Sequence, residues 1–381
     1  MAGTRPLRVL HVLGRLNPGG VESWLLNVFR TADRRSVRFD VMVHQAAEGL
    51  YDAEVRKLGV GIHHNTEYRN VTRYYRTFRE IAGATRYDVV HSHVHHYSAV
   101  VLACAAALGI PVRIAHSHND TQAADRRSGT ARRAYLTAMR ALLQVSATKG
   151  VACSRVAATA LFGERWRRAG CELLYCGVDA VSFGGVSERL PVRTEFQLPA
   201  DAEILIHVGR FDHQKNHALL VDAFAALARR RQSVALLLVG GGPLEESIRG
   251  RARDLGVQDR IRFCGRRADV PRLLMAADAF VFPSHHEGLP LACLEAQAAG
   301  LPVVLSDRIT PEVVVAPERV TVLPLGAAET WAHGIEAALH LGRDSECGLK
   351  AVAGSPFDIR RSTESLLALY AAQTDARAVA A

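Results

Sequence analysis

Two glutamates bracket a glycine turn in FPSHHEGLPLACLEAQAAGLPVVLSD, residues 282–307. Glu287 and Gly288 follow a predicted strand, and Glu295 lies in the helix predicted after the turn. At the start of that helix, the backbone N–H groups of Gly288 and Leu289 could bind a phosphate oxygen. Carboxylates accept strong hydrogen bonds from hydroxyl groups, so this stretch predicts a ligand with both phosphate and sugar hydroxyls. The alternative is that both glutamates only favour the positive end of the helix dipole.

Two cations follow another predicted strand, in HVGRFDHQKNH, residues 207–217. Arg210 and Lys215 stand in the short loop where the strand ends, which is where open α/β sheets bind ligands. Together they would neutralise a diphosphate. The alternative is that both are ordinary solvated loop cations.

A paired glycine turn occurs early, in NPGGVESWLLNVFR, residues 17–30. Gly19 and Gly20 allow close approach of the backbone, and the helix predicted from about Val21 presents free N–H groups. This geometry suits an anion such as phosphate. An ordinary strand-to-helix turn would have the same sequence pattern.

Four histidines crowd the stretch YDVVHSHVHHYSAV, residues 87–100, and raise the question of a metal. His91, His93 and His96 come close to an HxHxDH metal motif, but His95 stands where the aspartate should be. That carboxylate matters because it helps to hold the second ion of a two-metal site. His91 and His93 alternate along a strand and so share one face, while His95 and His96 fall in the turn. We therefore interpret this cluster as the lining of a cleft and predict no metal site, with a metal-dependent hydrolase as the alternative.

The elements that must position these residues alternate between short apolar runs and helical patterns. Such alternation predicts parallel sheets built from βαβ units, with strands covered on both faces. The predicted strands span 7–13, 39–44, 88–93, 112–118, 150–154, 172–178, 203–210, 235–242, 261–265, 279–284, 302–307 and 320–325.

A stretch rich in turn formers divides the pattern into two domains. The N-terminal domain is predicted over 1–180, the linker over 181–199 and the C-terminal domain over 200–356. An amphipathic helix is expected over 357–373.

Composition is that of a globular protein, with 381 residues and 49% hydrophobic side chains. The seven cysteines include no CxxC pair, which argues against a disulfide framework or a thiolate zinc site. No signal peptide or membrane-spanning run is evident. We therefore expect a cytoplasmic protein, one possible peripheral location being the inner face of the membrane. The net charge of +9 does not by itself identify a partner.

Taken together, these residues resemble the retaining family-4 glycosyltransferases of the GT-B fold. The resemblance rests on the Gly19–Gly20 turn, the Arg210 and Lys215 loop and the EX7E motif from Glu287 to Glu295. The resemblance covers essentially the whole chain. In detail, the chain most resembles bacterial exopolysaccharide and capsule glycosyltransferases. It implies two Rossmann-like domains whose parallel sheets face each other across a cleft, with a C-terminal helix that crosses back to the N-terminal domain.

The resemblance also implies roles for individual residues. Arg210 and Lys215 would hold the donor diphosphate, with the amides of Gly288 and Leu289. Glu287 would contact sugar hydroxyls beside the reacting carbon, and Glu295 the ribose. The remaining implied contacts are Gly265 and Arg266 near the base, Gly19 and Gly20 near the phosphate, and the family histidine at His116, with His118 as the fallback.

The implied reaction moves a sugar from a nucleotide-diphosphate sugar, with UDP expected, to an acceptor hydroxyl with retention of anomeric configuration. The nucleotide sugar is a co-substrate, and neither a cofactor nor a metal is expected. The acceptor would be a sugar, a lipid-linked sugar or a small molecule. A nucleotide-sugar epimerase on the same fold is an alternative, but it would not need the paired glutamates.

Arginines crowd residues 68–80 and 124–144, the first of these stretches interleaved with tyrosines. A nucleic-acid binder is one interpretation, but no recognised nucleic-acid-binding motif accompanies the charge, so we expect no nucleic-acid partner. A basic, aromatic face resting on anionic membrane lipid is the second interpretation, and a solvated helix face is the third.

Overall fold

The computed structural model describes residues 5–185 and 189–380 of the chain. They fall into two compact units, Met1–Gly177 with Ile359–Ala381, and Val178–Asp358. The segment 181–199, predicted as a linker, lies within the second unit. It contains part of the 3-10 helix η2 (Ala180–Phe183) and all of α8 (Arg189–Glu195), while its residues 186–188 lie outside the described residues.

The first unit contains a 7-stranded sheet in the order β3-β2-β1-β4-β5-β6-β7, and each neighbouring pair of strands is parallel. The strands are β1 (Leu7–Leu13), β2 (Val37–Val43), β3 (Gly61–His64), β4 (Val89–Ser92), β5 (Val112–Ser117), β6 (Lys149–Ala152) and β7 (Cys171–Leu173).

Apolar residues at consecutive positions make the central strands of this sheet. β1 is buried without interruption from Val9 to Leu13, and all four residues of β4 are buried. This is the pattern of strands covered on both faces. The edge strand β3 was not predicted, because its sequence GIHH is short and only partly buried.

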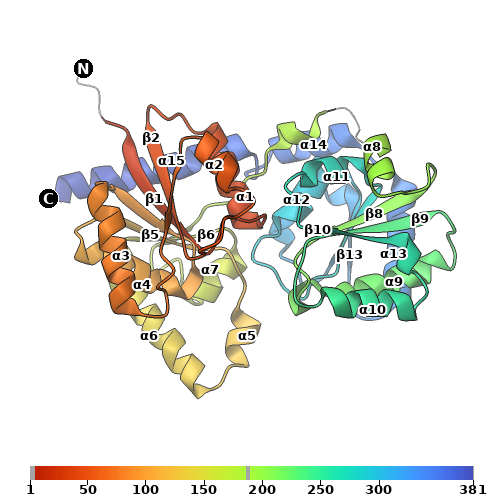
Figure 1. Cartoon of the computed structure of the whole chain (residues 1–381), viewed down its shortest axis with the longest axis horizontal. Coiled ribbons are helices and arrows are strands. Elements are labelled where there is room, and N and C mark those ends of the chain that lie inside the picture. The colour runs from red at the N-terminus through yellow and green to blue at the C-terminus, as the bar shows by residue number, and fades with distance from the viewer. Residues whose placement is uncertain (1–4, 186–188, 381) are drawn as a thin grey trace. The chain divides into compact units, whose positions relative to one another are not determined.

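Helices accompany the strands of the first unit (Figure 1). They are α1 (Gly20–Thr31), α2 (Asp52–Lys57), α3 (Val71–Ala84), η1 (His95–Tyr97), α4 (Ser98–Ala107), α5 (Gln122–Arg126), α6 (Thr130–Ser146), α7 (Arg155–Phe162) and α15 (Ile359–Ala380).

The C-terminal helix α15, drawn in blue in Figure 1, belongs to the first unit although the chain passes through the second unit before reaching it. The indole Nε1 of Trp24 in α1 donates a hydrogen bond to Ser362 Oγ over 2.9 Å. Tyr370 is completely buried. This confirms the predicted helix that returns to the N-terminal domain.

The second unit contains a 6-stranded parallel sheet in the order β10-β9-β8-β11-β12-β13. Its strands are β8 (Glu203–Val208), β9 (Val234–Val239), β10 (Ile261–Gly265), β11 (Ala279–Phe282), β12 (Val303–Ser306) and β13 (Val320–Leu323).

The core of the second unit forms where α9 and α13 cover apolar strands such as β9, which is buried at all six positions. The other elements of this unit are α9 (His217–Ala228), α10 (Glu245–Asp254), α11 (Val270–Ala276), α12 (Leu291–Ala298), α13 (Ala328–Leu341), α14 (Ser345–Ala353), η3 (His213–Lys215), η4 (Gln258–Arg260), η5 (Pro311–Val313) and η6 (Pro317–Arg319).

Both sheets reverse their winding direction once, between β1 and β4 in the first unit and between β8 and β11 in the second. This is the doubly wound Rossmann arrangement, in which ligands bind outside the carboxyl ends of the strands at the reversal point. The strand orders therefore select two places to search for function.

Candidate active site

A capped turn after β8 positions Lys215. The Asp212 carboxylate accepts a hydrogen bond from the backbone N–H of Lys215 over 3.3 Å. The next residue, Asn216, adopts the left-handed conformation with φ 52° and ψ 45°, a region that asparagine tolerates better than most residues. This turn holds the lysine at the carboxyl end of β8.

Lys215 and Glu287 form an ion pair across the reversal point of the second sheet. The Nζ atom of Lys215 lies 2.7 Å from Oε1 of Glu287, and the two side chains are only 16% and 9% exposed. The Lys215 ammonium also lies 4.6 Å from the ring centroid of Phe282 in β11, which is a cation–π contact. The structure thus brings together two of the predicted residues.

Further bonds join the loops that carry this pair. The backbone N–H of His285 donates to the carbonyl of Gln214, and Gln214 Nε2 donates to the carbonyl of His286, each over 2.8 Å. The rings of His213 and His285 stack with their centroids 4.7 Å apart. These contacts fix the two loops as one structure, so the ion pair is preorganised.

Arg210 lies in the same loop but is held more loosely. Its side chain is 52% exposed, and its Nε atom comes only within 4.0 Å of the Asp212 carboxylate. An exposed guanidinium at a strand end can turn toward an anionic ligand with two parallel hydrogen bonds.

The second glutamate of the pair, Glu295, is half-buried in α12. That helix begins at Leu291, directly after the extended residue Pro290. Burial raises the pKa of Glu295 to about 7. A carboxyl group with this pKa can be neutral near pH 7 and can then donate as well as accept a hydrogen bond. Leu289, predicted to offer its amide to phosphate, has a buried side chain before the helix.

The other predicted donor residues of this unit follow β10. Gly265 has a positive φ of 67°, and its carbonyl accepts a hydrogen bond from the N–H of Gly240 after β9. In turn, a Cβ atom on Gly240 would lie 2.0 Å from the carbonyl oxygen of Gly209, so only glycine fits there. Arg266 is exposed. Loops after β8, β9 and β10 therefore meet at one end of the sheet.

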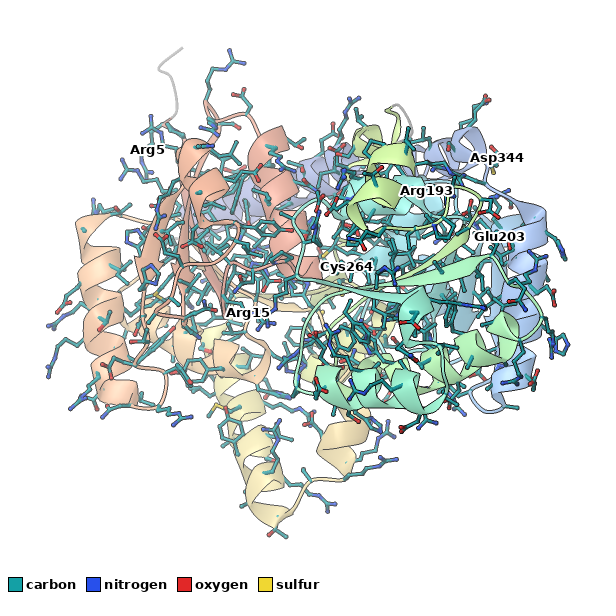
Figure 2. All side chains as sticks on the ribbon, turned by 45° about the vertical axis from the view of Figure 1, so that its right-hand side comes forward. Arg5, Arg15, Arg193, Glu203, Cys264 and Asp344 are labelled. Carbon is teal, nitrogen blue, oxygen red and sulfur yellow. The ribbon has the colours of Figure 1, made fainter. Side chains whose placement is uncertain are left out.

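In the first unit, the Gly19–Gly20 turn precedes α1 as predicted, and it holds a carboxylate. A Cβ atom on Gly19 would lie 2.5 Å from Oε2 of Glu22, so the glutamate folds back against this turn. Burial raises the pKa of Glu22 to about 7, although the charge of Arg15 opposes the rise. Figure 2 labels Arg15 on the loop between β1 and α1. A neutral Glu22 would not repel an anion at the start of α1.

The first sheet gathers histidines at its own reversal point. The hydrogen-bonded nitrogen pairs are His11 Nδ1 with His93 Nε2 (3.0 Å), His93 Nδ1 with His118 Nε2 (2.9 Å) and His91 Nε2 with His116 Nδ1 (3.2 Å). The hydroxyl of Tyr370 completes the chain, 2.7 Å from His91 Nδ1 and 3.4 Å from His11 Nε2. We name these five histidines the histidine cluster.

Burial decides the chemical state of this cluster. Burial, strengthened by the neighbouring His118, holds the pKa of His116 well below its ordinary value. Burial likewise lowers the pKa of His11 to about 3. The rings of His116 and His11 are therefore neutral at pH 7. His116 is 0% exposed, whereas His118, whose ring centroid lies 3.8 Å away, is 8% exposed.

The chain matches known families over both units. Residues 18–181 match the model of Glycosyltransferase Family 4, and residues 189–347 match that of Glycosyl transferases group 1. The putative glycosyltransferase EpsF of Bacillus subtilis is 32% identical to the chain over 97% of each protein. The chain belongs to glycosyltransferase family 4.

Other relatives of this family-4 glycosyltransferase agree in fold and kind. The capsular polysaccharide biosynthesis glycosyltransferase CapH of Staphylococcus aureus is 22% identical over 97% of this chain and 99% of its own length. The crystal structure of Anabaena HepE in complex with UDP and glucose superposes with a TM-score of 0.78 at 19% identity, covering 96% of this chain and 100% of HepE. The fold of this chain is therefore GT-B, and the chain resembles exopolysaccharide and capsule enzymes.

The hydrolase alternative required His91, His93 and His96 to bind a metal together, and the described residues do not bring these three side chains to one point. His96 Nε2 lies 3.4 Å from an Asp125 carboxylate oxygen. Among residues 5–185 and 189–380, the groups with converging ligand atoms are His11, His91 and His93, and His93, His116 and His118. Neither includes His96. His91 was also predicted to line a cleft, but it is 0% exposed and lies beneath the surface.

Sequence reasoning missed three residues of these sites. Glu22 could have been found, because it stands three positions after the first residue of the glycine turn, where a carboxylate commonly reaches back to a helix start. His11 and Tyr370 had no local signal, since 359 positions separate them along the chain.

No helix among the described residues is long and apolar enough to cross a membrane. Helix α6 is mostly exposed and carries arginines, together with Tyr135, which is 40% exposed, and Val145, which is 77% exposed.

Proposed function

We propose that this glycosyltransferase moves a sugar from a UDP-sugar to an acceptor hydroxyl with retention of anomeric configuration, in the synthesis of a bacterial polysaccharide or glycoconjugate. The observation that carries the proposal is the partly buried Lys215–Glu287 ion pair at the reversal point of the second sheet. A fixed cation beside a fixed carboxylate suits a ligand whose phosphate and hydroxyl groups are neighbours. The similarity to CapH, a capsular polysaccharide biosynthesis glycosyltransferase, supports the polysaccharide context.

The donor would lie over the carboxyl ends of the strands in the second unit. Lys215 would meet the diphosphate as a charge already in place, and Arg210 would turn onto it from the surface. The amides of Gly288 and Leu289 would add hydrogen bonds at the start of α12. Preorganised groups of this kind stabilise charge that develops on a leaving diphosphate.

The two glutamates would take different tasks because their surroundings differ. Glu287, which pairs with the Lys215 ammonium, would accept hydrogen bonds from hydroxyls of the transferred sugar. Glu295, whose pKa burial raises to about 7, would bind the ribose hydroxyls. Gly265 and Arg266 would lie near the base. The HepE structure with UDP and glucose supports uracil as the base and a hexose as the sugar.

Retention follows if the acceptor hydroxyl attacks the face that the diphosphate leaves. The C–O bond to the diphosphate breaks, the new glycosidic bond forms, and a leaving phosphate oxygen takes the hydroxyl proton. The chain then needs no covalent nucleophile and no metal for this step, because Lys215 and Arg210 supply the positive charge.

The first unit would bind the acceptor, which we expect to be a sugar, a lipid-linked sugar or a small molecule. Gly19 and Gly20 would approach the donor phosphate. His116 is the proposed catalytic histidine; since it has no exposed surface, it would need the ring of His118 to move before it could touch a sugar. Comparing His116→Asn with His118→Asn would tell which ring acts.

A donor screen tests the proposal directly. The chain is incubated with a panel of nucleotide sugars, and nucleotide release and thermal shift are measured for each. We expect a UDP-sugar to give both signals and Lys215→Ala to lose nucleotide release. A response to no donor in the panel would contradict the proposed function.

A further inference from the structure

We propose that His93, His116 and His118 form a binding site for one Zn²⁺ ion in the first unit. One nitrogen from each of the three rings lies within 4.8 Å of the other two. Zinc takes imidazole nitrogen at about 2.0–2.1 Å, and three histidines with one open position are a common zinc arrangement. The three rings come from the end of β4 and the end of β5, so the sheet itself brings them together.

An unsatisfied nitrogen marks the place of the ion. Nε2 of His116 is buried and has no hydrogen-bond partner among the described residues. The backbone of Leu174 approaches this ring and opposes the lowering of its pKa, but Nε2 has no partner with normal hydrogen-bond geometry. A buried polar atom without a partner is costly, and a bound cation would remove that cost.

The other nitrogens of the three rings are already supported. His93 Nε2 lies 3.0 Å from His11 Nδ1, and His116 Nδ1 lies 3.2 Å from His91 Nε2. Zinc-binding histidines nearly always bond through the nitrogen that faces away from the ion, which fixes the tautomer and the ring orientation.

His118 fits the same pattern, because its Nδ1 lies 3.7 Å from Cys176 Sγ. This leaves Nδ1 of His93, Nε2 of His116 and Nε2 of His118 as the ligand atoms. The two from His93 and His118 are 2.9 Å apart and share a proton in the metal-free chain. Zinc would take the place of that shared proton, which would pass to the outer nitrogen of the ring that held it, so that each ring carries one N–H on its outer nitrogen.

The second group of converging histidines is a poorer site. In the group of His11, His91 and His93, both nitrogens of His11 and of His91 are bonded to other rings or to Tyr370. An ion there would have to break the hydrogen bonds to Tyr370. Of the two groups, only the one with His116 offers a ring nitrogen that would give up no hydrogen bond on binding zinc.

An ion can reach the proposed site from solvent, since His93 is half-buried and His118 retains an exposed edge. Zinc would also immobilise the ring that the proposed function gives to the sugar. The inhibition of transfer by zinc, unlike the zinc site itself, rests on the proposed function.

Metal binding to the full chain tests the site without any activity assay. Protein stripped with a chelator is titrated with Zn²⁺ against a chromophoric chelator, and Co²⁺ absorption reports the coordination. We expect one ion per chain. His116→Asn and His118→Asn should each weaken binding by at least about a hundredfold, and His11→Asn, which removes only a supporting bond, by about 10–100-fold.

His95→Asn is the matched control, because this residue belongs to the same stretch of sequence but to neither converging group. It should bind zinc like the natural chain. Less than one ion per chain, or unchanged affinity in a folded His118→Asn variant, would overturn the proposal, and circular dichroism establishes that the variant is folded. Stoichiometric binding without inhibition of transfer would support the zinc site and contradict the catalytic role of His116.

Discussion

The Lys215 ammonium lies 2.7 Å from the Glu287 carboxylate although 72 positions separate them in the sequence. Each residue follows a strand, and β8 and β11 are neighbours only because the sheet reverses its winding between them. The ion pair is therefore a product of topology. A ligand phosphate would meet a lysine whose position is set before the ligand arrives.

Lys215→Ala should lower kcat/KM by at least about a hundredfold, the scale of losing one preorganised electrostatic group. Glu287→Ala should lower it by a similar amount, because it removes a sugar contact and leaves the partly buried Lys215 without its partner. Steady-state kinetics with the donor found in the screen measures both. Near-normal kinetics in either variant would contradict the assigned site.

Lys350→Ala is the matched control for that experiment. Lys350 pairs with Glu346 over 2.6 Å in the same unit, but the two side chains are 75% and 79% exposed. Exposed pairs contribute little, so kcat/KM should not change. A loss equal to that of Lys215→Ala would show that removing any lysine pair disturbs the unit.

Because of Glu295, we expect the free energy of unfolding to depend on pH. Its pKa rises from an ordinary 4.5 to about 7 on folding, so the folded chain binds the proton more tightly than the unfolded chain. The free energy of unfolding should therefore fall as the pH rises from about 4.5 to about 7. The shift of about 2.5 pKa units bounds the loss at about 3.5 kcal/mol, since each pKa unit corresponds to about 1.4 kcal/mol.

Glu295→Gln should flatten that fall, because an amide does not ionise. Urea unfolding of both chains between pH 5 and pH 8 measures the difference. Glu22, whose pKa is also about 7, contributes equally to both chains and cancels. Parallel curves for the two chains would mean that the Glu295 carboxyl is better hydrated than its burial suggests.

Much of this fold could be predicted because its strands are continuous apolar runs. The strand predicted over 7–13 is β1, residue for residue, and the segment predicted over 261–265 is β10. The edge strand β3 has no such run and was missed. Short strands near solvent gain little from burial, so their sequences are less constrained.

The position of a candidate site residue was predictable only where it lies in a loop that follows a strand. Arg210, Lys215 and Glu287 satisfy that condition, and strand order then places their loops. The burial of His116 was not predictable, since it depends on Trp24 from α1 and on the neighbouring His118. Nor was the contact of Tyr370 with His91, which requires α15 to return from the far end of the chain.

Tyr370→Phe should destabilise the first unit by about 1–3 kcal/mol, the cost of leaving buried partners unsatisfied. The hydroxyl that is removed forms a hydrogen bond with His91 Nδ1 and lies 3.4 Å from His11 Nε2. All three residues are fully buried. Urea unfolding measures the change. Tyr135→Phe, at a residue that is 40% exposed, is the control and should change little. Equal stabilities of the two variants would show that the tyrosine hydroxyl does not support the histidine cluster.

We expect the exposed arginines of helix α6 to attract the chain to anionic membrane. Basic residues near such a surface contribute about 1 kcal/mol each, and Arg132 and Arg133 are both exposed on this helix. The double variant Arg132→Glu and Arg133→Glu should weaken co-sedimentation with phosphatidylserine-containing vesicles by about tenfold or more.

The control replaces Arg34 and Arg38, which are also exposed in the first unit, by glutamate, and this variant should bind like the natural chain. Equal weakening in both variants would mean that net charge, and not the α6 surface, governs the contact. No preference of the natural chain for anionic over neutral vesicles would exclude the membrane role of α6.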